Sequence, residues 1–126
     1  MVLWALEHAE GGELYVPKIP SYRITDVATA IAPGAEQRVV GVRPGEKLHE
    51  EMVTASDSFN TADLGRYYAI LPSAGMHSLE AYCAARGGKP VVPGFAYNSG
   101  SNERFLDVEE IRALIREHVD PEFVPA

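Results

Sequence analysis

The spacing of apolar and polar positions predicts a chain of short helices and short strands in mixed order. The clearest helix follows Asp107, which forms an Asp-x-x-Glu capping box with Glu110. Apolar residues three and four apart then line one face of this helix. They are Val108, Ile111, Leu114 and Ile115. The same spacing predicts a short helix near residues 2–9, ended by Gly11-Gly12, and another over 25–32, where Thr25 is the expected N-cap.

Between and after these helices, the pattern predicts several short strands. Branched and aromatic residues favour strands over 13–16, 38–42 and 66–71. Residues 46–53 and 78–86 are candidates for a short and a weak helix, and three to four helices are expected in the fold as a whole. The chain over 91–97 is expected to be extended, and Asn98-Ser99-Gly100-Ser101-Asn102 has the composition of a turn.

This order of elements favours a small mixed α/β (α+β) lobe. Strands and helices alternate, but the strands are short and their connections vary, which does not fit a doubly wound sheet that holds a dinucleotide. A length of 126 residues suits a single domain over 1–126. Within it, the polar segment 54–64 is expected to be an irregular, mobile loop.

Charge and composition narrow the classes of function. The 18 acidic and 11 basic residues give a net charge of −7, which argues against a nucleic-acid partner but allows a local basic pocket for a small anion. The single cysteine, Cys83, cannot form an intrachain disulfide, and a reducing cytoplasm is the expected location. No apolar run reaches the roughly 20 residues that span a bilayer, so no membrane association is expected.

The motifs of common catalytic sites are absent from the sequence. There is no Gly-x-Gly-x-x-Gly or Walker turn, and therefore no cofactor site is expected in this chain. His49-Glu50 begins like a zinc-binding His-Glu-x-x-His motif, but Val53 stands at the second ligand position, so no metal site is expected. No tyrosine is followed four residues later by lysine, and no catalytic residue is assigned.

One segment carries distinctive chemistry: Arg43-Pro44-Gly45-Glu46-Lys47. A guanidinium at a strand end, followed by a turn and a helix start, can grip a phosphate in bidentate fashion, with help from the free amides of the helix. Lys47 adds a second positive charge, and Glu46 could accept from a sugar hydroxyl or orient Arg43. The alternative interpretation is a solvated turn with a surface ion pair.

Three stretches of the chain together resemble a known family. They are Gly12-Glu13-Leu14-Tyr15-Val16-Pro17-Lys18-Ile19-Pro20-Ser21, Ile24-Thr25-Asp26 and Gly41-Val42-Arg43-Pro44-Gly45-Glu46-Lys47-Leu48-His49-Glu50. They resemble the inverting UDP-N-acetylglucosamine 4,6-dehydratases, which are polysaccharide-biosynthesis proteins of the extended short-chain dehydrogenase/reductase superfamily. Gly94-Phe95-Ala96-Tyr97-Asn98-Ser99 and the last helix resemble the tail of the same family.

The resemblance implies which part of such an enzyme this chain corresponds to. The family holds NADP in a Rossmann half, where its catalytic Tyr, Lys and Asp also lie, and none of these matches here. The chain then corresponds to the C-terminal substrate-binding lobe. By the same resemblance Arg43 is expected to bind the UDP pyrophosphate, with Glu46 and Lys47 beside it. Lys18 lies in a matching motif, where it contacts the ligand or belongs to a loop stiffened by Pro17 and Pro20.

Two interpretations of function follow from the resemblance. In the first, the chain binds a UDP-sugar for glycan biosynthesis and is inactive alone, because a Rossmann half with NADP, made separately or belonging to the same longer enzyme, completes it. In the second, it is a non-catalytic, self-associating module, and the first helix and the Trp4 region form an exposed apolar face that makes it a homo-oligomer.

Overall fold

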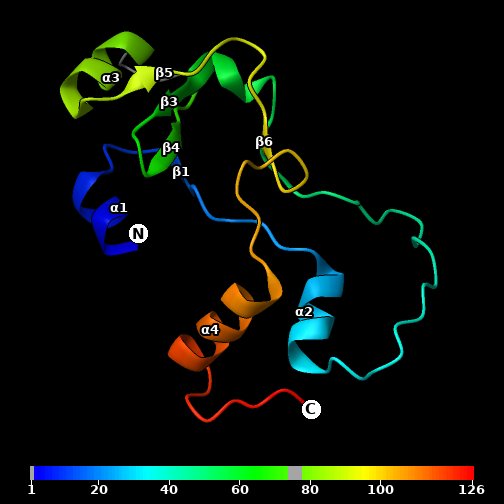
Figure 1. The fold of residues 1–126 in the computed structure, drawn as a ribbon. Coiled ribbons are helices and arrows are strands. Elements are labelled where there is room, and N and C mark those ends of the chain that lie inside the picture. The colour runs from blue at the N-terminus through cyan, green and yellow to red at the C-terminus, as the bar shows by residue number, and fades with distance from the viewer. Residues whose placement is uncertain (1, 74–77) are drawn as a thin grey trace. The chain divides into compact units, whose positions relative to one another are not determined.

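The computed structural model describes residues 2–73 and 78–126, which form helices and short strands in mixed order (Figure 1). In chain order the elements are α1 (Val2–His8), β1 (Leu14–Pro17), α2 (Ile24–Ile31), β2 (Glu51–Val53), the 3₁₀ helix η1 (Asp57–Asn60), β3 (Thr61–Asp63), β4 (Tyr67–Ile70), α3 (Leu79–Arg86), β5 (Lys89–Pro90), β6 (Tyr97–Asn98) and α4 (Val108–His118). The predicted mixed α/β class, with short strands, is confirmed, and the described residues contain four α-helices.

The chain folds into two compact units. Unit 1 comprises Met1–Ile19 and Glu51–Asn98, and unit 2 comprises Pro20–Glu50 and Ser99–Ala126. The expectation of one domain over 1–126 stays a prediction. Among the described residues, no helix is both long and apolar enough to cross a membrane.

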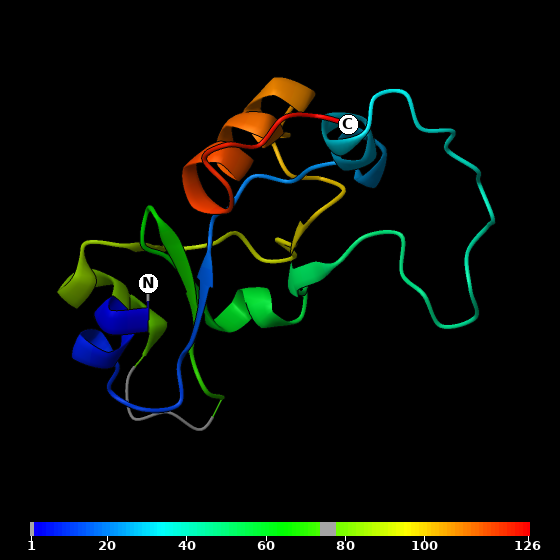
Figure 2. The same ribbon diagram turned by 90° about the horizontal axis from the view of Figure 1, so that it is seen from below.

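Unit 1 is built on two antiparallel sheets. The larger has the strand order β1-β4-β3-β5, and Figure 2 shows β1 and β4 side by side. The smaller pairs β2 with β6. Ala62 and Ala69 of the larger sheet pack against Tyr82 and Cys83 of α3, and all four side chains are buried. The single cysteine thus packs in the core as a small hydrophobic residue.

Unit 2 is held together by α2 and α4. Ala30, Leu106 and Ile111 form its buried core. The guanidinium of Arg112 donates to the carbonyls of Ala30 (3.1 Å) and Thr29 (3.3 Å), near the C-terminal end of α2, where carbonyls lack helical partners.

The predicted capping box of α4 is confirmed. The Glu110 amide donates to the Asp107 carboxylate at 2.8 Å, and the Asp107 amide donates to the Glu110 carboxylate at 3.0 Å. The prediction of Thr25 as the N-cap of the second helix is wrong. The helix begins at Ile24, and Arg23 stands at the cap position without a side-chain capping bond.

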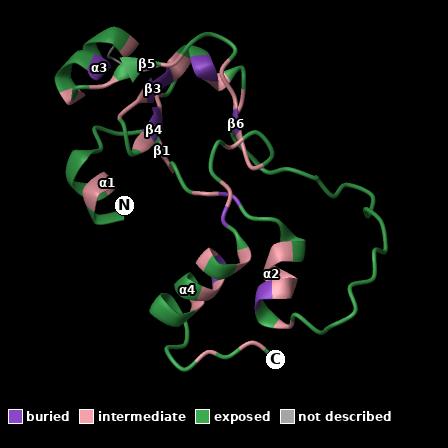
Figure 3. Ribbon diagram, in the orientation of Figure 1, coloured by how far each residue is buried: buried purple, intermediate pink, exposed green. Residues whose placement is uncertain are grey.

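The strand predicted over 38–42 is absent. These residues have no strand partner among the described residues, and a strand needs a neighbour for its amides and carbonyls. Residues 33–50 are exposed throughout (Figure 3), and the side chains of Val39 and Val40 are 93% and 82% exposed. Local β-propensity alone therefore did not produce a strand here.

The helix predicted over 46–53 and the irregular loop predicted over 54–64 are also wrong. Pairing of β2 with β6 buries Val53, and this tertiary pairing prevails because a helix of about two turns is marginal without packing. In 54–64, the hydroxyl and amide of Thr54 both bind the Asp57 carboxylate, so the polar groups are satisfied locally. The segment then forms η1 and β3 with Ser58 and Thr61 buried. Its mobility stays a prediction.

Candidate functional site

The Arg43 segment forms a tight turn that its own residues specify. The Glu46 amide donates to the Arg43 carbonyl at 3.0 Å, and the Arg43 amide donates to the Glu46 carboxylate at 2.9 Å. Pro44 presets the backbone at the second position, and Gly45, at the third, has a φ of +84°. This is the residue pattern of a type II turn, in which the third residue must adopt a positive φ that glycine allows. The turn is therefore encoded locally.

The turn leaves its positive charges available to a ligand. The side chains of Arg43 and Lys47 are exposed, and no described residue forms a hydrogen bond or ion pair with either. The guanidinium fork of Arg43 suits two oxygens of a phosphate. The Glu46 carboxylate closes the turn on the Arg43 amide, and its contact with a ligand stays a prediction. The expected helix amides do not contribute, since no helix follows the turn.

The exposed segment is attached to unit 2 near both ends. Near the first end, the Gln37 side-chain amide donates to the Thr29 hydroxyl on α2 at 3.1 Å. At the second end, the Glu50 amide donates to the Ser99 hydroxyl at 2.9 Å, and the Ser99 amide donates to the Glu50 carbonyl at 2.8 Å. From 38 to 48, the turn itself supplies the only backbone–backbone hydrogen bond within the described residues.

Lys18, the remaining candidate, lies in unit 1 just after β1. Its ammonium is 2.6 Å from the Asp63 carboxylate and 4.4 Å from the centre of the Tyr68 ring. Burial by itself would raise the pKa of Asp63. The hydrogen bonds from Lys18 and the Gly65 amide and the charges of Lys18 and Lys89 outweigh it, and the pKa is lowered. Lys18 thus has a structural partner that the sequence did not reveal, and ligand contact by Lys18 stays a prediction.

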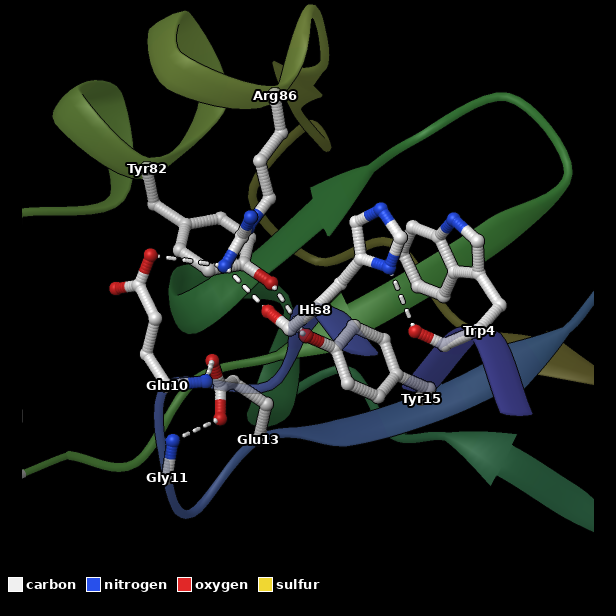
Figure 4. Close-up of polar contacts among 8 residues, drawn as sticks. All are labelled: Trp4, His8, Glu10, Gly11, Glu13, Tyr15, Tyr82 and Arg86. Carbon is white, nitrogen blue, oxygen red and sulfur yellow. Dashed lines mark hydrogen bonds and ion pairs between the residues drawn. The ribbon is translucent and has the colours of Figure 1, made fainter. Parts of the chain in front are cut away.

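A second polar cluster joins α1, β1 and α3 in unit 1 (Figure 4). The Arg86 guanidinium donates to the His8 carbonyl at 2.7 Å and to the Glu10 carboxylate at 2.9 Å, so it satisfies the C-terminal end of α1. It also lies 4.5 Å from the centre of the Tyr82 ring. The Tyr82 hydroxyl is 3.1 Å from that of Tyr15. Burial of the Tyr15 hydroxyl raises its pKa, and the hydrogen bond with Tyr82 raises the pKa further.

Aromatic packing completes the attachment of α1. The Trp4 ring is stacked with Tyr67, at 5.1 Å between ring centres, and with His8, at 4.4 Å. The Tyr15 ring lies nearly perpendicular to that of Trp4, at 5.2 Å between ring centres. Trp4 therefore packs against the rings of Tyr15 and Tyr67. No group of three or more acidic, histidine or cysteine side chains in 2–73 and 78–126 could hold a metal ion. The aromatic contacts and the Arg86 hydrogen bonds hold α1 against β1, β4 and α3.

Sequence comparison identifies the family. The profile of a family described as polysaccharide biosynthesis protein matches residues 1–72, which is more than half of the chain. The chain belongs to this family. The resemblance seen in Arg43 to Glu50 and around Lys18 is thereby confirmed at the family level.

Individual relatives carry the names of enzymes that act on UDP-sugars. The chain is 38% identical over 118 residues to a UDP-N-acetylglucosamine 4,6-dehydratase (inverting) of Campylobacter jejuni, covering 90% of this chain and 35% of that protein. It is 34% identical over 119 residues to a UDP-glucose 4-epimerase of Rickettsia felis, covering 91% of this chain and 34% of that one. The chain thus spans about a third of the length of the relatives it matches.

A solved structure supports the fold. The X-ray structure of Pen from Bacillus thuringiensis superimposes with a TM-score of 0.71 at 24% identity, over 91% of this chain and 34% of that chain. The arrangement of helices and short strands seen in this chain therefore also occurs as part of a larger protein, Pen.

Proposed function

We propose that this chain is the C-terminal, UDP-sugar-binding portion of a nucleotide-sugar 4,6-dehydratase of glycan biosynthesis. The observation that carries the proposal is the Arg43 turn, where the guanidinium of Arg43 and the ammonium of Lys47 have no partner among residues 2–73 and 78–126. Both relatives above are named for UDP-sugars, so the group their substrates share is UDP. A pyrophosphate is the part of UDP that exposed cations recognise.

The rest of the enzyme is supplied by other residues under this proposal. A Rossmann half would hold NADP and the catalytic tyrosine, lysine and aspartate, either as a separate protein or as further sequence. The chain by itself would bind substrate without turning it over. A cytoplasmic location, where nucleotide sugars are made, is part of the same proposal.

Calorimetric titration with UDP tests the role of Arg43. We expect Arg43→Ala to weaken UDP binding by about 1.5–3 kcal/mol, the range for a hydrogen bond to a charged group. Arg38→Ala is the matched control, because Arg38 is also exposed and unpaired among the described residues but lies outside the turn. Equal losses in the two variants would show a general charge effect and refute a specific contact by Arg43.

Reconstitution tests the division of labour. Mixing the chain with the NADP-binding portion of a related dehydratase and UDP-N-acetylglucosamine should release a 4-keto-6-deoxy sugar, whereas neither part alone should do so. Failure with every NADP-binding portion that folds would refute the proposed division, even if UDP binds.

A self-associating module is the second candidate, and the surface of α1 favours it. The side chains of Val2, Leu3 and Leu6 are 66%, 76% and 75% exposed, which leaves an apolar face on this helix. Sedimentation equilibrium should then show a dimer or larger species that Leu3→Glu dissociates. A monomer at all concentrations would exclude this function and leave the first one intact.

A further inference from the structure

The chain after the Arg43 turn packs on a glycine that has no room for a side chain. A Cβ placed on Gly100 would lie 2.6 Å from three ring atoms of His49, whereas ordinary contacts begin near 3.4 Å. The backbone of Gly100 does not have a positive φ, so an alanine there is not strained by conformation. The requirement for glycine at position 100 is therefore the close approach of the His49 ring.

The neighbouring residues make the same attachment through hydrogen bonds. Glu50 and Ser99 exchange two bonds, from the Glu50 amide to the Ser99 hydroxyl and from the Ser99 amide to the Glu50 carbonyl, at 2.9 and 2.8 Å. We call the four residues His49, Glu50, Ser99 and Gly100 the loop clamp. It joins two segments about fifty residues apart in the sequence.

The clamp is the attachment closest to Arg43 and Lys47. The other is the Gln37–Thr29 hydrogen bond, a single contact between exposed side chains. Within the described structure, the backbone of residues 38–48 forms no other backbone–backbone hydrogen bond than that of the turn. The turn and the clamp are therefore the constraints on the backbone that carries the two cations. An ordered loop does not have to be immobilised again when a ligand binds, which favours affinity.

We propose that Ser99 and Gly100 are positioning residues for the phosphate contact of Arg43, acting through His49 and Glu50. The ligand in this inference, UDP, comes from the proposed function, whereas the contacts among the four residues do not depend on it. Neither Ser99 nor Gly100 carries a charge, and their effect on UDP binding would be indirect.

The test compares Gly100→Ala with Gly34→Ala. Gly34 is the matched control because it lies in the same unit, has no positive φ, and a Cβ there would meet nothing within 4 Å. We expect Gly100→Ala to weaken UDP binding roughly three- to tenfold, which corresponds to the contribution of about one hydrogen bond. The amide NMR signals of Gly45 and Glu46 should shift even without UDP, while those of α4 stay in place.

Removing the ring that the new methyl would meet tests whether the effect of Gly100→Ala passes through His49. His49→Ala should weaken UDP binding by itself, and the double variant His49→Ala/Gly100→Ala should match His49→Ala instead of adding a second loss. A merely structural effect would lower the thermal midpoint while leaving the Gly45 and Glu46 amide signals in place. Ser99→Ala provides an independent variant if Gly100→Ala does not fold, with a smaller loss expected in the same direction.

The outcomes distinguish this inference from the proposed function. Unchanged Gly45 and Glu46 signals in Gly100→Ala and Ser99→Ala would overturn the clamp, whatever UDP does. Absence of UDP binding by the unmodified chain would count against the proposed function, while the amide signals would still decide whether the clamp orders the turn.

Discussion

Replacing Lys18 with methionine tests whether this candidate residue holds unit 1 together. The change removes the ammonium but keeps an unbranched stem over the Tyr68 ring. The Lys18 and Asp63 side chains are only 29% and 21% exposed, so their ion pair is partly shielded from water. A partly exposed pair contributes up to about 1 kcal/mol, and a cation over an aromatic ring about 0.5–1 kcal/mol. We therefore expect unit 1 to lose about 1–2 kcal/mol of unfolding free energy near neutral pH.

The pH dependence of this loss has a definite sign. The pKa of Asp63 is lower in the folded chain than its ordinary value, so its stabilising contribution is complete above the unfolded-state pKa of about 3.9. It is lost as the pH falls through the folded-state pKa, because the neutral acid no longer attracts Lys18. The difference between the unmodified chain and Lys18→Met should therefore be full near neutral pH and shrink below about pH 4.

Urea unfolding followed by Trp4 fluorescence measures this difference in the correct unit. Trp4 is the only tryptophan of the chain and stacks on Tyr67 in unit 1. Lys47→Met is the matched control, since Lys47 is exposed and has no ion pair in the described structure. A deficit of equal size at neutral and acidic pH, or none at neutral pH, would refute the argument. UDP titration of Lys18→Met then separates the two roles: lost affinity would indicate ligand contact, and unchanged affinity would assign Lys18 to structure.

Two further predictions concern unit 2 and the single thiol. Asp107→Ala removes the cap of α4 and should lower the free energy of unfolding by about 1 kcal/mol, measured as faster amide hydrogen exchange in α4. Glu117→Ala, an exposed change in the same helix, should leave the exchange rates unchanged. Equal effects of the two changes would contradict the capping argument. Cys83 is buried, and burial together with the charge of Glu80 raises its pKa, so an aromatic disulfide reagent should modify it at least about tenfold more slowly in the folded chain than in urea. Equal rates would show that α3 opens readily.

Local patterns predicted the elements whose stability is local or whose packing face is unambiguous. The capping box of Asp107 and the apolar stripe behind it located α4, and Pro44-Gly45 located the turn at Arg43. The patterns failed where the pairing partner is distant. Residues 38–42 look like a strand but have none beside them, and residues 51–53, which look helical, pair with Tyr97-Asn98 instead.

The sequence by itself determined the family, the mixed α/β class and the position of the Arg43 turn, because a motif, a periodicity and a proline–glycine turn each act over a few residues. Only the tertiary structure showed that Lys18 is held by Asp63, forty-five positions away, and that His49 packs on Gly100. The physical reason is that ion pairs and steric fit depend on which distant segments meet. Chain topology decides this, and no spacing along the sequence records it.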